Sequence, residues 1–204
     1  MNKEAVRVAV FVSGGGTNLQ ALLDSEGSVL KHAKISLVLA SNEKAYALER
    51  AKKANVETLV VRKKDYKTQL DYEEAMRKEL EARHIDLIVL AGFMTILSEN
   101  FVKYYDHRII NVHPSLIPSF CGEGFYGLRV HEAALEKGVK VTGATVHFVN
   151  EIPDGGDIIL QEAVKVRKND TPETLQRRVM EQAEWKLLPK AVEMVAKERL
   201  THRR

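Results

Sequence analysis

The run from Asn111 to Pro118, Asn-Val-His-Pro-Ser-Leu-Ile-Pro, places an amide, an imidazole and a hydroxyl at the end of an apolar segment, residues 108–112. Side chains fixed where a strand ends are well placed for proton transfer or for donating hydrogen bonds to a reacting oxygen. The two prolines prevent a helix or ladder from continuing, which predicts an ordered loop. The competing interpretation is a turn in which Asn111 and His113 only satisfy backbone groups.

A second polar cluster, Asp154-Gly-Gly-Asp157, also adjoins an apolar run. Asp154 could simply be an Asx-turn residue. In an open α/β sheet, however, loops at the carboxyl ends of the strands converge on one crevice. We therefore expect Asn111, His113 and Asp154 to form an amide, imidazole and carboxylate trio, with His147 as a further candidate. A metal site of His113, His147 and Asp154 is a weaker interpretation, because no close pair such as His-x-x-x-His accompanies them.

A third cluster, Ser-Gly-Gly-Gly-Thr-Asn at residues 13–18, follows the first apolar run. It lacks the lysine of a P-loop and does not match Gly-x-Gly-x-x-Gly. Glycines before a helix still expose backbone N–H groups at the positive end of its dipole, which suits a phosphate monoester. Thr17 and Asn18 can add donors. The alternative is a glycine-rich turn in which Asn18 is the N-cap.

The elements that position these clusters alternate along the first 125 residues. Strands are predicted at 6–12, 35–40, 58–61, 86–91 and 108–112, and helices at 18–23, 45–54, 71–83 and 98–105. Apolar strands alternating with helices indicate an open doubly wound α/β fold with a mostly parallel sheet.

After residue 125 the pattern changes. A helix at 129–137 precedes two strands at 141–149 and 158–166, whose short connection predicts a C-terminal antiparallel pair. A final helix begins near Pro172, with Asp170 or Thr171 as its cap, and runs toward Pro189 or beyond.

Composition limits the class of protein. A chain of 204 residues, 45% of them hydrophobic, can bury one substantial core. The net charge of +3 comes from 31 basic and 28 acidic residues mixed along the chain, which provides little attraction to nucleic acid. No run approaches the roughly twenty apolar residues of a membrane span, and no signal peptide is recognisable. With the single cysteine, Cys121, this predicts a cytoplasmic protein that binds neither nucleic acid nor membrane.

Five motifs in order give the chain a specific resemblance. They are Ser-Gly-Gly-Gly-Thr-Asn-Leu-Gln (13–20), Leu-Ala-Gly-Phe-Met-Thr-Ile-Leu (90–97), Asn-Val-His-Pro-Ser-Leu-Ile-Pro (111–118), Thr-Gly-Ala-Thr-Val-His-Phe-Val (142–149) and Asp-Gly-Gly-Asp-Ile-Ile (154–159). Over essentially its whole length the chain resembles the phosphoribosylglycinamide formyltransferases. The resemblance implies a Rossmann-like formyltransferase fold in a single domain, 1–204, with a phosphate-binding half (1–105) and a catalytic and folate-binding half (106–204).

The resemblance implies a reaction in purine biosynthesis. The formyl group of 10-formyltetrahydrofolate, a co-substrate, passes to the glycyl amine of glycinamide ribonucleotide without a metal. Asn111, His113 and Asp154 occupy the catalytic positions. Direct amine attack gives a tetrahedral oxyanion, which Asn111 and a protonated His113 would stabilise. Asp154 should raise the pKa of His113 and order a water that relays the amine proton.

The resemblance also implies the binding residues. Those for the ribonucleotide are Gly16, Thr17, Asn18 and Glu184. Those for the folate are Met94, Thr95, Ile96, Leu97, Asn111, Asn150, Glu151, Ile152, Pro153 and Asp154, and Leu97 and Val102 supply apolar walls. Thr95 stands where many relatives have arginine. The segment 119–127 is longer than in some members and could be a lid or a surface insertion.

Three alternatives remain at this point. Methionyl-tRNA formyltransferase and formyltetrahydrofolate deformylase share the Asn-x-His…Asp pattern, but each carries a further domain that 204 residues do not accommodate. A nucleotide- or folate-binding module without turnover is the third, and the intact trio argues against it. Small molecules are the expected partners, and the sequence leaves monomer and homodimer open.

Overall fold

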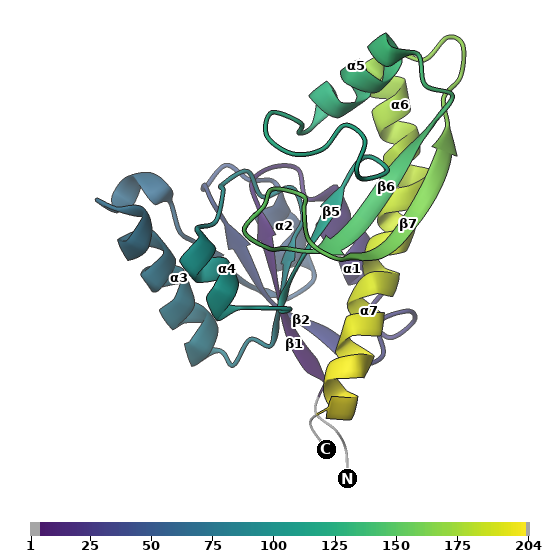
Figure 1. Cartoon of the computed structure of the whole chain (residues 1–204). Coiled ribbons are helices and arrows are strands. Elements are labelled where there is room, and N and C mark those ends of the chain that lie inside the picture. Colours follow the sequence, from purple (N-terminus) through teal and green to yellow (C-terminus); the bar gives the residue numbers. More distant parts are fainter. Residues whose placement is uncertain (1–4, 203–204) are drawn as a thin grey trace.

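A seven-stranded mixed sheet forms the centre of the computed structural model, which describes residues 5–202 (Figure 1). Its strands lie in the order β3-β2-β1-β4-β5-β6-β7. They are β1 (Val6–Val12), β2 (Ala33–Ala40), β3 (Glu57–Val60), β4 (Leu87–Leu90), β5 (Ile109–His113), β6 (Val141–Phe148) and β7 (Ile158–Lys165). The first five strands are parallel, whereas β6 and β7 are antiparallel to their neighbours. The predicted C-terminal antiparallel pair is confirmed.

Helices cover both faces of the sheet, so the fold is doubly wound as predicted. They are α1 (Thr17–Asp24), α2 (Ala47–Lys53), α3 (Gln69–Ala82), α4 (Glu99–Tyr104), α5 (Leu128–Lys137), α6 (Pro172–Val179) and α7 (Trp185–His202), with a short 3₁₀ helix, η1 (Lys63–Asp65). Along β1, Val8 and Val10 join the core beneath α1, α2 and α7, whereas Ala9 and Phe11 join the core beneath α3 and α4. In Figure 1, α3 and α4 lie on one side of the sheet and α7 on the other.

The C-terminal helical region differs in one respect from the single helix predicted. Thr171, one of the two residues predicted as the cap, caps α6 through a capping box with Thr174. Between α6 and α7 the chain forms a π-helical segment, η2 (Met180–Glu184). A π-segment inserts a residue into a helix and is frequent at functional sites. Within residues 5–202 no helix has the length and apolarity to cross a membrane.

The order of the strands reverses beside β1. The chain leaves β1 toward β2 and β3, then crosses back so that β4 and β5 lie on the other side. At such a switch point the loops after neighbouring strands diverge and leave a crevice at the carboxyl ends. The segments that follow β1, β4 and β5 begin there, at Ser13, Ala91 and Pro114.

Candidate active site

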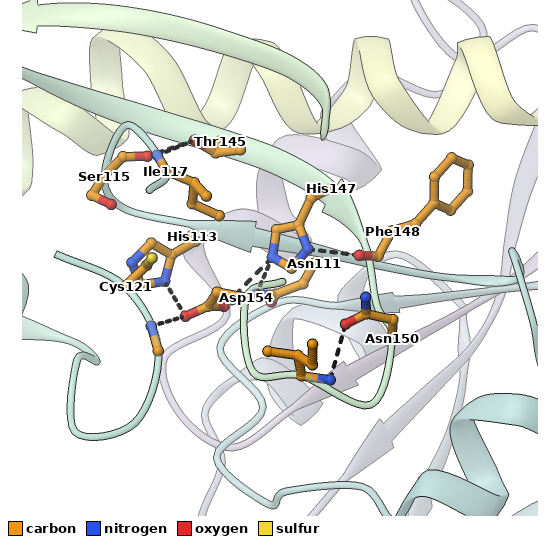
Figure 2. A network of polar contacts seen from close by, with 12 residues as sticks. Asn111, His113, Ser115, Ile117, Cys121, Thr145, His147, Phe148, Asn150 and Asp154 are labelled. Carbon is orange, nitrogen blue, oxygen red and sulfur yellow. Dashed lines mark hydrogen bonds and ion pairs between the residues drawn. The ribbon is translucent and has the colours of Figure 1, made fainter. Parts of the chain in front are cut away.

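Pairing of β5 with β6 brings the polar residues of the two strands together. In this antiparallel register Asn111 lies opposite His147, and His113 lies opposite Thr145. Directly opposed residues share a face of the sheet, so their side chains are neighbours. The turn after β6 then brings Asp154 up to Asn111 and His113, as Figure 2 shows. The trio expected from the sequence is therefore assembled in space.

The carboxylate of Asp154 is the centre of this cluster. Its Oδ2 accepts a hydrogen bond of 2.9 Å from the N–H of Gly122 and lies 3.4 Å from Nδ1 of His113. Its Oδ1 lies 3.4 Å from Nδ2 of Asn111 and 3.5 Å from Nε2 of His147. Asp154 has a left-handed backbone, with φ at 55°. Its side chain thus contacts the cluster, and the Asx-turn interpretation does not describe its role.

The two histidines are held in defined tautomers by backbone carbonyls. Nε2 of His113 lies 2.9 Å from the carbonyl oxygen of Phe120, and Nδ1 of His147 lies 2.7 Å from that of Phe148. A carbonyl oxygen can only accept, so each of these nitrogens carries a proton. The other nitrogen of His147, Nε2, lies 3.2 Å from Nδ2 of Asn111 and 3.5 Å from Oδ1 of Asp154, so its proton determines which of the two it pairs with. In neutral His113, the unprotonated Nδ1 faces Asp154.

Burial decides the charge of His113. The side chain is 4% exposed, and this desolvation lowers the pKa of its imidazole, although Asp154 and the Phe120 carbonyl oppose the shift. Asp154 does raise the pKa of His113, as predicted, but burial outweighs the carboxylate, so the net shift is downward. Burial alone would raise the pKa of Asp154, but His147, His113 and the Gly122 N–H together lower it. The imidazole of His113 therefore loses its proton more readily, and the carboxyl of Asp154 ionises more readily, than the free side chains.

The segment 119–127, here called the lid loop, lies against the catalytic side chains. Its Phe120 carbonyl contacts His113, and its Gly122 N–H contacts Asp154. Ser115 Oγ donates a bond of 2.5 Å to the Ser119 carbonyl, which fixes the start of the loop. Burial raises the pKa of the Cys121 thiol, which favours its protonated form. The lid loop is thus part of the site and more than a surface insertion.

All ten residues expected to contact folate line one cavity of about 170 Å³. Its other lining residues are Leu90, Phe93, Val102, His147 and Val149. Met94, Ile96 and Ile152 at this cavity are 55%, 76% and 60% exposed, respectively. Apolar side chains gathered around a concave site and left open to solvent suit a flat, largely apolar ligand. Asn111 and Asp154 belong to the same lining, so the cavity reaches the polar cluster.

The residues expected to bind the ribonucleotide lie at the start of α1 and in η2. Gly16 is the N-cap of α1, with φ at 71°, and a Cβ there would approach Ala47 Cβ to 2.6 Å, so glycine is required. Asn18 is not the cap. Its Nδ2 donates a bond of 2.7 Å to Oε2 of Glu184, and Thr17 Oγ1 lies 3.8 Å from Met180 Sδ. The interpretation of Asn18 as an N-cap is wrong.

The weaker metal interpretation finds no support in the geometry. His113, His147 and Asp154 do come together, but within residues 5–202 no group of three or more His, Cys, Asp or Glu side chains is arranged to hold a metal ion. His147, the further candidate from the sequence, contacts both Asn111 and Asp154. The position of His147 follows from the register between β5 and β6, which sets it opposite Asn111. The alternation of side chains along β6 alone does not reveal this register.

Comparison with known proteins finds similarity over nearly the whole chain. The family model described as formyl transferase matches residues 6–192. The chain is 38% identical over 194 residues to phosphoribosylglycinamide formyltransferase of Haemophilus influenzae, covering 95% of this chain and 89% of that one. It is 46% identical over 194 residues to the human trifunctional purine biosynthetic protein adenosine-3, covering 95% of this chain but only 19% of the relative.

A solved structure is similar over the same extent. The crystal structure of glycinamide ribonucleotide transformylase 1 from Symbiobacterium toebii superposes with a TM-score of 0.89 at 39% identity. The match covers 96% of this chain and 89% of that one.

Proposed function

The chain belongs to the formyl transferase family, and we propose that it transfers the formyl group of 10-formyltetrahydrofolate to the glycyl amine of glycinamide ribonucleotide in purine biosynthesis. The observation that carries this proposal is the convergence of Asn111, His113 and Asp154 beside the cavity lined by the ten folate residues. The names of the relatives identify the class of substrate, and the geometry supplies the groups that the reaction needs.

The reaction is a direct transfer between two bound substrates. The amine nitrogen attacks the formyl carbon, a C–N bond forms, and the formyl oxygen gains negative charge. Asn111 donates to this oxygen, because its Nδ2 contact to Asp154, 3.4 Å long, is weak enough to be exchanged. The tetrahedral species then collapses, and the bond from the formyl carbon to folate N10 breaks. Holding both substrates side by side removes the need for a covalent enzyme intermediate.

His113 and Asp154 carry the proton that the attacking amine loses during the transfer. A neutral imidazole can accept the proton that the attacking amine loses, and the neighbouring carboxylate stabilises the imidazolium. As an imidazolium, His113 supports the oxyanion and then returns the proton, through an ordered water, to N10 of the leaving folate. The lowered pKa of His113 supports this proton relay, in which the imidazolium forms during the reaction.

The ribonucleotide occupies the opposite side of the crevice. Its phosphate lies on the N–H groups of residues 16–18, at the positive end of α1. Glu184, buried beside Asn18, faces the glycinamide end of the same substrate. The folate lies against residues 94–97 and 150–154, so the half of the chain before residue 106 contributes to both substrates.

The larger relatives set the scope of this proposal. The chain spans 19% of the human trifunctional relative, so that protein's other activities are not carried over. We propose one domain over residues 1–204, a phosphate-binding half at 1–105 and a catalytic and folate-binding half at 106–204. The chain would act as a monomer or homodimer in the cytoplasm, on small molecules and without a metal.

The test mixes the purified protein with glycinamide ribonucleotide and a 10-formyl folate whose deformylation changes its absorbance. We expect turnover only when both substrates are present. Turnover without the ribonucleotide would indicate a formyl-folate hydrolase. Ligand binding without turnover in either mixture would favour a binding module and contradict the proposal.

A further inference from the structure

Ser13 is the first residue after β1 and lies at the point where the strand order reverses. It begins the phosphate loop, residues 13–18. The neighbouring segment after β4, residues 92–97, is the folate loop, whose last five residues line the folate cavity. Ser13 therefore lies between the two substrate-binding loops.

The contacts of Ser13 reach both loops. Its backbone N–H donates a bond of 3.1 Å to the carbonyl of Gly92, which extends the β1–β4 pairing by one step. Its side-chain Oγ accepts a bond of 2.9 Å from the N–H of Met94. Ser41 Oγ donates to the same oxygen at 2.8 Å, and Asn42 Nδ2 donates to the Ser13 carbonyl at 2.9 Å. The hydroxyl thus uses both of its acceptor sites.

The contact with Met94 matters because the folate loop has no ladder or helix to hold it there. Gly92 has a left-handed backbone, with φ at 72°, and turns the chain away from β4. Two residues later, the N–H of Met94 donates a hydrogen bond to the side chain of Ser13 in the phosphate loop. An alanine at position 13 would keep the backbone bond to Gly92 but remove the acceptor for Met94.

We propose that Ser13 is a positioning residue that joins the phosphate loop to the folate loop, so that each substrate binds more tightly when the other is present. This inference rests on the proposed function. Gly14 and Gly15 are exposed, and a Cβ on either would meet no atom within 4 Å, so the face of these two residues is open to a phosphate, while their carbonyls accept from the N–H of Ala47 at 3.1 Å and from Nε of Arg50 at 2.8 Å. Adjustment of residues 14–18 is transmitted through the Ser13 Oγ to Met94, which lines the folate cavity.

Coupling of this kind is reciprocal. If the ribonucleotide increases the affinity for folate by some factor, folate increases the affinity for the ribonucleotide by the same factor. One hydrogen bond between the loops corresponds to a factor of about five. Ser41 supplies a matched control, because its hydroxyl contacts the Ser13 hydroxyl and, within residues 5–202, forms no hydrogen bond with Met94.

The experiment measures binding by calorimetry with glycinamide ribonucleotide and tetrahydrofolate, which cannot react with each other. Wild type, Ser13→Ala, Ser13→Thr and Ser41→Ala are each titrated with tetrahydrofolate, without and with saturating ribonucleotide. We expect the ribonucleotide to tighten folate binding about five-fold in wild type and Ser41→Ala. The ratio of the Kd for tetrahydrofolate without ribonucleotide to the Kd with it should fall to one in Ser13→Ala. Ser13→Thr, which keeps the hydroxyl, should restore the wild-type ratio.

Steady-state kinetics give a second measurement. Ser13→Ala should raise the KM for formyl folate about five-fold and change kcat less than two-fold, because the catalytic trio is untouched. A ratio of one in wild type, or an unchanged ratio in Ser13→Ala, would overturn the coupling. Failure of wild type to bind either ligand would instead contradict the proposed function. Urea unfolding of all four proteins shows whether a variant is folded, and the threonine variant tests the hydroxyl if the alanine variant is not.

Discussion

Asn18 and Glu184 are 166 positions apart in the chain, yet Nδ2 of the asparagine donates a hydrogen bond of 2.7 Å to Oε2 of the glutamate. The bond fastens the first turn of α1 to η2. Burial raises the pKa of the Glu184 carboxyl to about 7, although the Asn18 donor opposes the shift. Ionising this carboxyl costs more in the folded protein than in the unfolded chain. The free energy of unfolding should therefore fall as the pH rises from 4.5 through 7.

Replacing Glu184 by glutamine should remove that dependence. The amide keeps an acceptor for Asn18 and cannot ionise. A shift from 4.5 to about 7 corresponds to about 3 kcal/mol. We expect Glu184→Gln to be more stable than wild type by up to this amount at pH 8 and equal to it near pH 4.5. Urea unfolding at the two pH values measures the difference, with the exposed Glu181→Gln as control. An equal effect at both pH values would contradict the raised pKa.

Much of the fold follows from local sequence patterns. The apolar run of β1 alternates between two cores, with Val8 on one side and Ala9 on the other, and this marks a strand covered on both faces. Pro172 after Thr171 marks the start of α6 for an equally local reason, because proline suits the first turn and threonine the cap. Such features depend on neighbouring residues alone, so they can be predicted without a structure.

Other features depend on contacts that no local pattern contains. The tautomer of His113 is set by the carbonyl of Phe120, and its pKa by burial beneath the lid loop. The helical periodicity of residues 172–202 does not reveal the η2 segment, because a π-segment adds only one residue to a turn. The pKa shifts of His113 and Glu184 both depend on burial, so they could not be predicted from the sequence alone.

Asp154→Asn should change the pH profile as well as the rate. Asp154 raises the pKa of His113 against the effect of burial, so removing its charge should lower that pKa further. If neutral His113 accepts the amine proton, kcat/KM rises with pH through this pKa. We expect the rising limb to move to lower pH in Asp154→Asn and kcat to fall by about 10²- to 10⁴-fold.

The matched control is Asp157→Asn, an exposed carboxylate on the same turn. Asp157→Asn should leave the rising limb of the kcat/KM pH profile, and kcat itself, near wild-type values. A limb that stays in place in Asp154→Asn would mean that His113 is not the group whose titration limits the reaction.

The lid loop contains two glycines, Gly122 and Gly124, that differ in whether their N–H contacts Asp154. Gly122 and Gly124 have φ at 86° and 85°, and a Cβ on either would meet no atom within 4 Å. Gly122 also donates its N–H to Asp154. Proline opposes a positive φ at either position, but only Gly122→Pro removes the donor.

We expect Gly122→Pro to lower kcat more than Gly124→Pro, because Asp154 loses the hydrogen bond that orients it. Chymotrypsin should also cleave the lid loop faster in Gly122→Pro, at Phe120, Phe125 or Tyr126. Rates of cleavage and turnover that are the same in the two variants would show that the bond to Asp154 does not hold the loop.

Glu73 should stabilise the folate loop from the side opposite Ser13. The side chain is 4% exposed, and its Oε1 accepts from the N–H of Ser98 at 2.6 Å and from Nε2 of Gln69 at 2.5 Å. Its Oε2 accepts from the Ser98 hydroxyl. Gln69 Nε2 also donates to the carbonyl of Ile96 at 3.2 Å, so α3 is bonded to the folate loop at Ile96 and to the N-cap of α4 at Ser98. Glu73→Ala leaves the N–H and hydroxyl of Ser98 without this acceptor, and we expect a loss of about 2 to 3 kcal/mol in the free energy of unfolding.

The same substitution should raise the KM for formyl folate, because Ile96 and its neighbours line the folate cavity. The KM for the ribonucleotide should stay within two-fold of wild type in Glu73→Ala, since no contact of Glu73 reaches residues 13–18. Glu74→Ala is the control: Glu74 forms a surface ion pair with Arg77 at 2.7 Å, and such exposed pairs contribute little to stability. Steady-state kinetics with each substrate varied in turn separate the two effects. Equal increases in both KM values would show that Glu73 supports the whole crevice, because a local anchor of the folate loop would affect one substrate only.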